Sequence, residues 1–177
     1  MPFREHTAIN ALLHLWGERC GDRDIPDRAD FDPTSIAPSL LPHFVLADIV
    51  DGGVRLRFRL LGTAIVNRFG FDPTGKYLDE TFSDRMVRYM MSLAQEAIAM
   101  RRPAFSKAVM APSDGSDPIV TARIYMPLTH AARKDVGPRD VAMILAVHDF
   151  GPPWRGGAPL IPVLADGDAR ELVRTIV

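Results

Sequence analysis

The residue types that could support chemistry are few in this sequence, and their spacing argues against a reaction centre. Cys20 is the only cysteine, so one chain can form neither a disulfide nor a thiolate metal cluster. His148 and Asp149 are neighbours on an expected strand, where successive side chains point to opposite faces. The histidines never recur at the intervals of metal ligands; they are His6, His14, His43, His130 and His148. We therefore predict no catalytic residue, no metal site and no cofactor.

Two further patterns approximate known binding loops but lack essential positions. Five aspartates between positions 22 and 32 suggest a calcium loop, yet Pro33 stands where such a loop needs a bidentate glutamate. The run from Gly70 to Tyr77 approaches the phosphate-binding pattern G-x-x-x-x-G-K-[ST], but Tyr77 replaces the magnesium-binding hydroxyl and Pro73 has no N–H. We interpret the aspartates as surface ion pairs and the glycine run as an ordinary turn.

The composition is that of one globular domain. The chain has 177 residues, with 21 Lys and Arg against 22 Asp and Glu and a net charge of -1. A nucleic-acid-binding domain normally carries a basic surplus, so nucleic acid is not an expected partner. The N-terminus lacks a basic segment followed by an apolar run, and no stretch approaches the roughly 18 apolar residues of a membrane span. We expect a cytoplasmic protein that does not engage a membrane.

An amphipathic helix is predicted over residues 7–20. Its large apolar side chains recur at helical spacing on one face: Ile9, Leu12, Leu13 and Trp16. Such a stripe needs a surface to cover it, so we predict that these residues form the interface of a homodimer. The alternative is a helix folded back on its own sheet. The predicted organisation is an N-terminal helix over 1–22, a main domain over 23–150 and a C-terminal tail over 151–177.

After this helix the periodicity changes to that of strands. Five segments have a strand-like apolar pattern: 44–50, 54–60, 104–111, 119–127 and 141–149. A short helix is expected over 62–70, and a longer one begins after Thr81 or Ser83 and stops before Pro103. The tail offers another short helix over 168–176. This order predicts an α+β domain with a five-stranded antiparallel sheet and flanking helices.

The apolar patterns also predict which strand faces are buried. Strands 44–50 and 141–149 are apolar on both faces, which places them side by side at the centre. In strand 54–60 the arginines alternate with the expected inward residues, which are Val54, Leu56, Phe58 and Leu60. In strand 119–127 the expected inward residues are Val120, Ala122, Ile124 and Met126. Neither inward set contains a carboxylate or a histidine.

Several short words occur in a distinctive order and spacing: Pro26-Asp-Arg28, Asp32-Pro33, Leu41-Pro42, Arg59-Leu-Leu-Gly-Thr63, Phe69-Gly70, Thr74-Gly75-Lys76 and Pro127-Leu128. Together they resemble the bacterial PAS domains of family 5, formerly a domain of unknown function. The resemblance covers approximately Leu12 to Phe150. It implies a sheet that grips a cavity with its helices, dimerisation through an N-terminal helix, and a role in sensing or in docking signalling partners. It implies no particular ligand.

Three functions follow as hypotheses. The first is a stand-alone sensory or regulatory module that binds a small apolar or amphipathic ligand in its core, because a methionine-rich helix suits a deformable cavity. The second is a protein-interaction domain with a solid core that docks a signalling partner. The third, a cone-shaped isomerase or hydratase, needs a buried general base that the inward sets lack. The residues expected around a ligand are Phe58, Asn67, Phe69, Tyr89, Ile124 and Leu145, with Asn67 as its polar contact.

Overall fold

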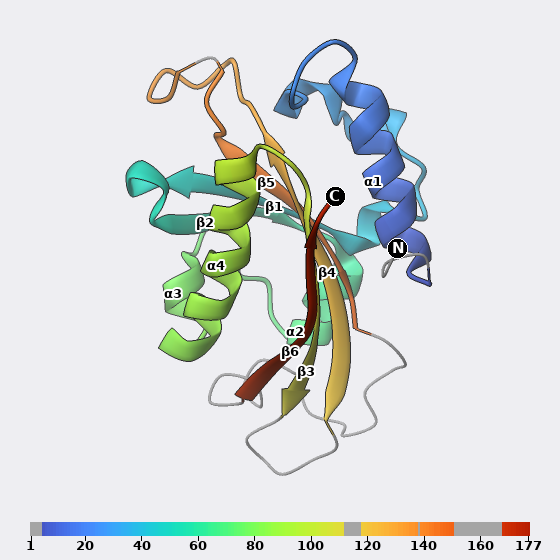
Figure 1. The fold of residues 1–177 in the computed structure, drawn as a ribbon, viewed down its shortest axis with the longest axis vertical. Coiled ribbons are helices and arrows are strands. Elements are labelled where there is room, and N and C mark those ends of the chain that lie inside the picture. Colours follow the sequence, from blue (N-terminus) through green and yellow to red (C-terminus); the bar gives the residue numbers. More distant parts are fainter. Residues whose placement is uncertain (1–4, 112–117, 138, 151–167) are drawn as a thin grey trace.

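An antiparallel sheet runs through the protein and separates two layers, one of which contains α1 (Thr7–Cys20) and the other α4 (Asp84–Met100) (Figure 1). The computed structural model describes residues 5–111, 118–137, 139–150 and 168–177. In spatial order the six strands are β2 (Arg55–Leu61), β1 (Phe44–Val50), β5 (Met143–Asp149), β4 (Ile119–Leu128), β3 (Ala104–Ala111) and β6 (Asp168–Ile176). The predicted α+β class with an antiparallel sheet is confirmed, and β1 and β5 are adjacent interior strands as expected.

The sixth strand corrects the prediction for the tail. The segment Asp168–Ile176 is not a helix: it pairs with β3 along the whole edge of the sheet. Two physical reasons favour the strand. The edge of β3 offers unpaired backbone groups, and the segment ends in the β-branched residues Val173, Thr175 and Ile176, which suit a pleated surface. The sequence also predicts a tight turn over 114–117 and contains an apolar run at 160–164, and both lie outside the described residues.

Strand β2 contains a bulge that changes which residues face the core. Leu46 pairs with Leu60 but Ala47 pairs with Phe58, so Arg59 is an extra residue in β2. As a result Leu61 is buried, while Leu60 turns to the opposite face and is 37% exposed. Val54 precedes the strand and is 62% exposed. The inward prediction therefore holds for Leu56 and Phe58 and is wrong for Val54 and Leu60.

Three helices cover one face of the sheet, which we call the helix side. They are α2 (Thr63–Phe69), α3 (Leu78–Thr81) and α4, of which sequence analysis missed only α3. The Ser83 side chain accepts a hydrogen bond from the Met86 backbone N–H at the start of α4. The helix ends at Arg101, which adopts a left-handed conformation two residues before Pro103. Met86, Met90 and Ala94 from α4 pack into this core.

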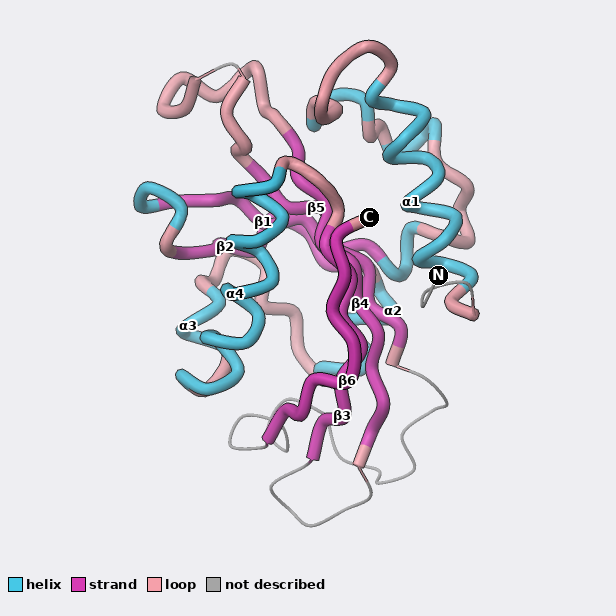
Figure 2. The backbone as a smooth tube through the Cα atoms, in the orientation of Figure 1, coloured by secondary structure: helices cyan, strands magenta, loops and turns pink. Residues whose placement is uncertain are grey.

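The other face, the α1 side, is covered by α1 and by the irregular connection to β1, which contains three short 3-10 helices (Figure 2). Ile9 and Leu12 are fully buried, Trp16 is 8% exposed and Leu13 is half-buried. The Trp16 indole N–H donates to the carbonyl oxygen of Pro127 on β4 at 3.0 Å. Within one chain, the apolar stripe of α1 thus packs on its own sheet, the alternative arrangement to a dimer interface.

Strand β4 is buried on both faces, whereas its sequence predicted one apolar face. Ala122, Ile124 and Met126 face the α1 side, and the intervening residues Arg123 and Tyr125 face the helix side. The expected inward sets of β2 and β4 consequently lie on opposite faces of the sheet. Val120, near the start of β4, is 44% exposed and belongs to neither core. Arg123 is therefore buried at a position where the alternating pattern predicted a solvent-exposed side chain.

Candidate ligand cavity and the polar row beside it

A small cavity lies between the sheet and the helix side, and we call it the core cavity. Its volume is about 30 Å³. Two polar residues, Tyr125 and His148, lie on its sheet wall. The apolar lining includes Val45, Ala47, Phe58, Phe69, Met90 and Ile144. A volume of this size is about the share that one water molecule occupies in the liquid, so the core is nearly filled in this conformation.

Aromatic rings surround one end of the core cavity. Phe69 meets Phe82 and Phe150 edge to face, with ring centroids 5.7 and 6.3 Å apart. The His148 ring stacks on Phe150 with centroids 5.7 Å apart. These contacts join α2, the segment before α4 and the end of β5. Movement of any of these rings would change the volume of the cavity.

A row of polar residues crosses four strands beside this cavity, and we call it the polar row. Register pairing brings together His148 of β5, Arg123 of β4, Ser106 of β3 and Arg174 of β6. His148, Arg123 and Ser106 are 8%, 3% and 0% exposed, respectively. All four side chains lie on the helix side, where α4 covers them. The row is a polar strip inside an otherwise hydrophobic layer.

Arg123 is the most deeply buried charged residue of the polar row. Its Nη2 donates to Thr121 Oγ1 at 2.9 Å, and its Cζ lies 5.1 Å from the centre of the Tyr89 ring. Its Nε is buried and has no acceptor. Among the described residues, no carboxylate oxygen lies within 4.0 Å of a guanidinium nitrogen of Arg123, so Arg123 has no ion pair there. The buried cation is thus held by neutral groups: the Thr121 hydroxyl, the Tyr89 ring face and the neighbouring Tyr125 phenol.

The other end of the polar row carries its own carboxylates. Arg174 Nε lies 2.8 Å from Glu171 Oε1, and Arg174 Nη1 lies 3.2 Å from Glu96 Oε2 on α4. Ser106 Oγ donates to the same Glu171 oxygen at 2.7 Å and lies 2.7 Å from the Tyr89 hydroxyl. Strand β6, which the sequence analysis did not predict, therefore fastens α4 to the sheet and compensates Arg174.

Burial controls the ionisation of the two polar residues that line the cavity. Burial, together with a smaller effect of the Arg123 cation, lowers the pKa of His148 from 6.5 to about 3. Burial raises the pKa of the Tyr125 phenol, against the opposing effect of Arg123. Both groups are therefore neutral near pH 7 and can form hydrogen bonds. An imidazole with so low a pKa is a weak general base, which argues against proton-transfer chemistry at this site.

The structure divides the six residues predicted around a ligand. Phe58 and Phe69 line the core cavity, and Tyr89 covers Arg123 beside it. Ile124 and Leu145 belong to the core of the α1 side, so they are separated from the cavity by the sheet itself. Asn67 is exposed on α2. Ligand contact by any of the six stays a prediction.

Sequence analysis missed the polar residues of the site. His148 was considered only as a strand neighbour of Asp149 and as one of the histidines without metal-ligand spacing, and Arg123 was not considered. The inward sets contained no histidine because they covered only β2 and β4, and on β4 they took the face toward α1. One signal was present: Thr121, Arg123 and Tyr125 alternate with apolar residues in a strand that is apolar on its other face.

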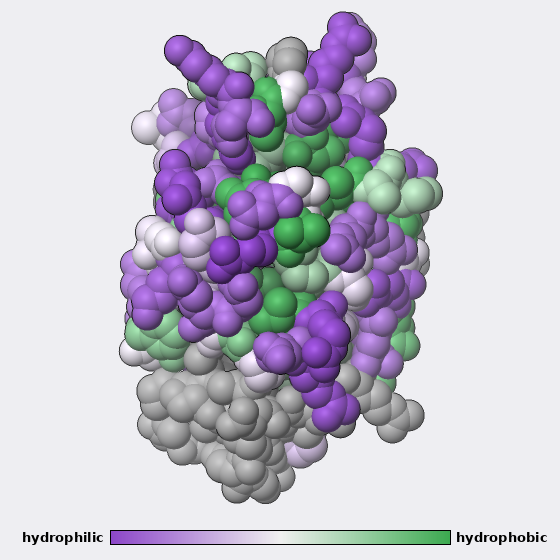
Figure 3. Space-filling view, turned by 90° about the vertical axis from the view of Figure 1, so that its left-hand side faces the viewer, coloured by the Kyte–Doolittle hydropathy of each residue, from purple (hydrophilic) through white to green (hydrophobic). Residues whose placement is uncertain are grey.

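A second hollow, the outer groove, lies on the α1 side of β1 and β2. Its apolar part has a volume of about 300 Å³ and is lined by residues such as Phe31, Ile36, Phe44 and Leu61. A polar part of about 670 Å³ adjoins it, and both parts share Arg28, Leu46 and Leu60. On the side of the molecule that carries β2 and α3, hydrophobic residues show as a band between hydrophilic margins (Figure 3).

The polar part of the outer groove contains a buried carboxylate with abundant partners. Asp48, which is 4% exposed, lies 3.0 Å from Arg59 Nε, 3.3 Å from Arg57 Nη2 and 3.9 Å from Arg133 Nη1. Arg57 and Arg59 of β2 thus pair with Asp48, and Arg55 pairs with Asp51 and Asp79, so all three arginines of this strand are ion-paired. Asp48 contrasts with Arg123, which has no such compensation.

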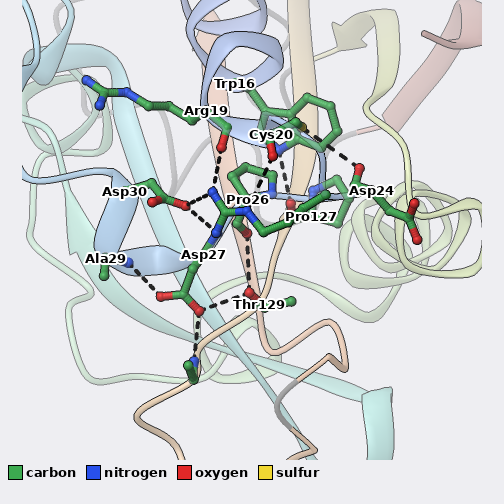
Figure 4. Close-up of polar contacts among 12 residues, drawn as sticks. Trp16, Arg19, Cys20, Asp24, Pro26, Asp27, Ala29, Asp30, Pro127 and Thr129 are labelled. Atoms are coloured by element: carbon green, nitrogen blue, oxygen red, sulfur yellow. Dashed lines mark hydrogen bonds and ion pairs between the residues drawn. The ribbon is translucent and has the colours of Figure 1, made fainter.

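The Pro26-Asp-Arg28 word has a structural role. Asp27 accepts hydrogen bonds from Ala29 N, Thr129 Oγ1 and Ala131 N at 2.8 to 2.9 Å (Figure 4). Arg28 N donates to the Thr129 carbonyl at 2.9 Å, so the segment pairs with the end of β4. Burial alone would raise the pKa of Asp27, but these hydrogen bonds outweigh it and lower the pKa. The word fastens the connection that forms the outer groove.

The part of the chain that the structure describes contains no helix long and apolar enough to cross a membrane. It also contains no group of three His, Cys, Asp or Glu residues placed to hold a metal ion.

Comparison with known proteins gives one family. The family model described as PAS domain, PAS family 5, matches residues 4–137. No curated protein matches the chain. The matched range contains α1, the connection with the Pro26-Asp-Arg28 word, and four of the six strands. PAS domains are generally sensory or regulatory modules without enzymatic activity. The match covers most of the chain, which therefore belongs to the PAS domain family, as its sequence words suggested.

Proposed function

We propose that this PAS domain is a ligand-responsive regulatory module whose small ligand enters the core cavity. The observation that carries this proposal is the combination of apolar walls with the neutral, buried polar groups of Tyr125 and His148. Such a combination is typical of small-molecule sites, in which apolar contacts supply affinity and a few polar groups fix orientation. A purely structural core would be filled more stably by hydrophobic side chains.

The size of the cavity suggests how binding would be transmitted. Because about 30 Å³ accommodates little more than a water molecule, a ligand must displace side chains to enter. Met90 on α4 and Phe82 just before it both line the cavity. Methionine repacks readily, and a shift of Phe82 would act on Phe69 of α2 through their ring contact. Ligand uptake would therefore move helices on one face of the sheet.

Native mass spectrometry of the full chain, as purified and after denaturation and refolding in ligand-free buffer, tests this function. We expect an additional mass on the purified chain that is lost after refolding. Ala146 lines the cavity and is 3% exposed, so Ala146→Leu should fill the space and abolish the retained mass while the chain still folds. Ala142, equally buried on the α1 side, provides the control Ala142→Leu. A retained mass unaffected by Ala146→Leu would contradict the proposal.

A second candidate function is the docking of a signalling partner in the outer groove. The specific observation in its favour is the apolar hollow of about 300 Å³ with Leu60 exposed at its edge. Leu60→Glu would then abolish partner binding without changing ligand retention. A partner that still binds Leu60→Glu would exclude this surface.

We also propose that the protein works in the cytoplasm, where the buried thiol of Cys20 stays reduced. Burial raises the pKa of this thiol, which makes it unreactive. A homodimer is a separate proposal. Because Ile9, Leu12 and Trp16 are covered within one chain, it requires either exchange of α1 between two chains or another surface.

A further inference from the structure

We propose that the ligand of the core cavity is a small carboxylate and that Arg123 is its counter-ion. This inference rests on the proposed function, because it names the chemical class of the ligand for the same cavity. Arg123 is 3% exposed and has a buried Nε without an acceptor.

Burying a charge in a protein costs free energy. A guanidinium removed from water is stable only if nearby groups compensate its charge and its hydrogen-bond donors. The structure does this elsewhere: Asp48 has three arginines around it, and Arg174 has two glutamates. Arg123 has Thr121 Oγ1 as its hydroxyl acceptor, the face of the Tyr89 ring, and the neighbouring Tyr125 phenol, none of which carries a negative charge. Of the charged residues in the polar row, it alone lacks a carboxylate among the described residues.

Position connects this cation to the cavity. Arg123 is the direct register partner of His148, and both side chains lie on the helix side. Tyr125, two residues further along β4, shares that face and lines the cavity beside His148. An anionic group that entered past these two neutral residues would reach the guanidinium. Tyr125 could donate a hydrogen bond to it through the phenol, and His148 through the ring N–H.

The acidic residues of the same layer are already engaged. Glu171 accepts from Ser106 and pairs with Arg174, while Glu96 pairs with Arg174 across from α4. Tyr89 and Ser106 stand between this pair of glutamates and Arg123. The Arg123 Nε–H therefore needs an acceptor that the described residues do not supply.

A second guanidinium lies at the aromatic end of the cavity. Arg68 on α2 places its Cζ 5.5 Å from the ring centre of Phe150, which itself stacks on His148. Burial lowers the pKa of Arg68, and its Nε has no acceptor. Its Nη2 donates to the Phe150 carbonyl at 3.4 Å. Two arginines without carboxylate partners among the described residues thus flank the same His148–Phe150 stack, and both favour an anion there.

The test compares an anion with its neutral isostere. Isothermal titration calorimetry of the full chain uses propionate and propionamide, which have nearly the same shape. We expect saturable binding of propionate and binding of propionamide that is weaker by at least about tenfold, because charge-assisted hydrogen bonds are lost. Arg123→Met should weaken propionate binding by a similar factor. The matched control is Arg88→Met, which removes an exposed arginine from α4 and should bind like the parent chain.

Folding of the variant is checked separately. Replacing an uncompensated buried cation by methionine should leave the unfolding temperature of the ligand-free chain unchanged or raise it. If Arg123→Met does not fold, Arg123→Lys keeps the positive charge but loses the planar fork, and should bind propionate more weakly than the parent. The comparison of propionate with propionamide on the parent chain needs no variant.

The outcomes separate this inference from the proposed function. Equal binding of propionate and propionamide, or binding unaffected by Arg123→Met, would overturn the carboxylate assignment. A neutral ligand retained in native mass spectra and lost in Ala146→Leu would overturn it too, yet would support the proposed function. Absence of both a retained mass and propionate binding would overturn the two together.

Discussion

Arg123 and His148 are directly paired residues of β4 and β5, and their side chains lie next to each other on the helix side of the sheet. One is a permanent cation and the other is a neutral imidazole, because burial and the cation itself both disfavour protonation of the ring. This pair places a positive charge beside a nearly filled apolar cavity. This arrangement is the basis for proposing an anionic ligand, and it disfavours a histidine base at the site.

Trp16→Ala should destabilise the single chain. The substitution removes a ring that is 8% exposed, together with its hydrogen bond to the Pro127 carbonyl. We expect a loss of about 3–5 kcal/mol in the free energy of unfolding, measured by urea denaturation. Trp16→Phe keeps most of the packing and should lose about 1 kcal/mol.

The dependence on chain concentration distinguishes the two arrangements of α1. If α1 packs on its own sheet, the loss caused by Trp16→Ala is the same at every concentration. If the stripe instead forms a dimer, the stability of the parent chain rises with concentration and light scattering shows a monomer for the variant. The second result would contradict the packing described above.

Arg174→Met tests the role of β6. The variant loses contacts to Glu96 and Ser92 on α4 and to Glu171 on its own strand. We expect a loss of about 1–2 kcal/mol in the free energy of unfolding, because the side chain is only partly shielded from solvent. Arg88→Met, which replaces an exposed arginine of α4, should change the free energy of unfolding by less. If both variants are equally stable, β6 does not fasten α4.

His148 should make the fold sensitive to acid. The unfolded chain takes up a proton at His148 near pH 6.5, whereas the buried ring does so only near pH 3. Between these values the unfolded state binds more protons, so stability falls as the pH falls. His148→Phe keeps a ring against Phe150 and removes this component. When the pH falls from about 6.5 to 4.5, we expect the free energy of unfolding of this variant to decrease by roughly 2–3 kcal/mol less than that of the parent chain.

Denaturation curves at several pH values measure this difference. His14→Gln serves as the control, since the His14 side chain is 76% exposed. Equal acid sensitivity of His148→Phe and the parent would show that the ring is not held neutral by burial.

The fold could largely be predicted because local pattern and burial agree over most of the chain. The two-sided apolar strands β1 and β5 are adjacent, and Ser83, one of the two expected caps, caps the long helix. The prediction was wrong where strand pairing outweighs the local sequence pattern. The segment Asp168–Ile176 contains Glu171 and Arg174 at helical spacing, yet the free edge of β3 draws it into the sheet.

The site was less accessible to sequence reasoning. Phe58 and Phe69 line the core cavity, whereas Ile124 and Leu145 lie on the other side of the sheet, and ligand contact by any of them stays a prediction. The two faces of a strand that is buried on both sides cannot be told apart by alternation alone. A buried arginine was also unexpected, because arginine between apolar residues normally indicates a solvent face.

The most direct measurement of the central claim is a propionate titration of the chain with ¹³C-labelled methionine methyl groups, followed by NMR. Met90 lines the core cavity, whereas Met143 is 3% exposed and lines the outer groove across the sheet. We predict that the Met90 methyl signal shifts with saturation while that of Met143 does not. A shift of Met143 without Met90 would place the ligand in the outer groove and contradict this account.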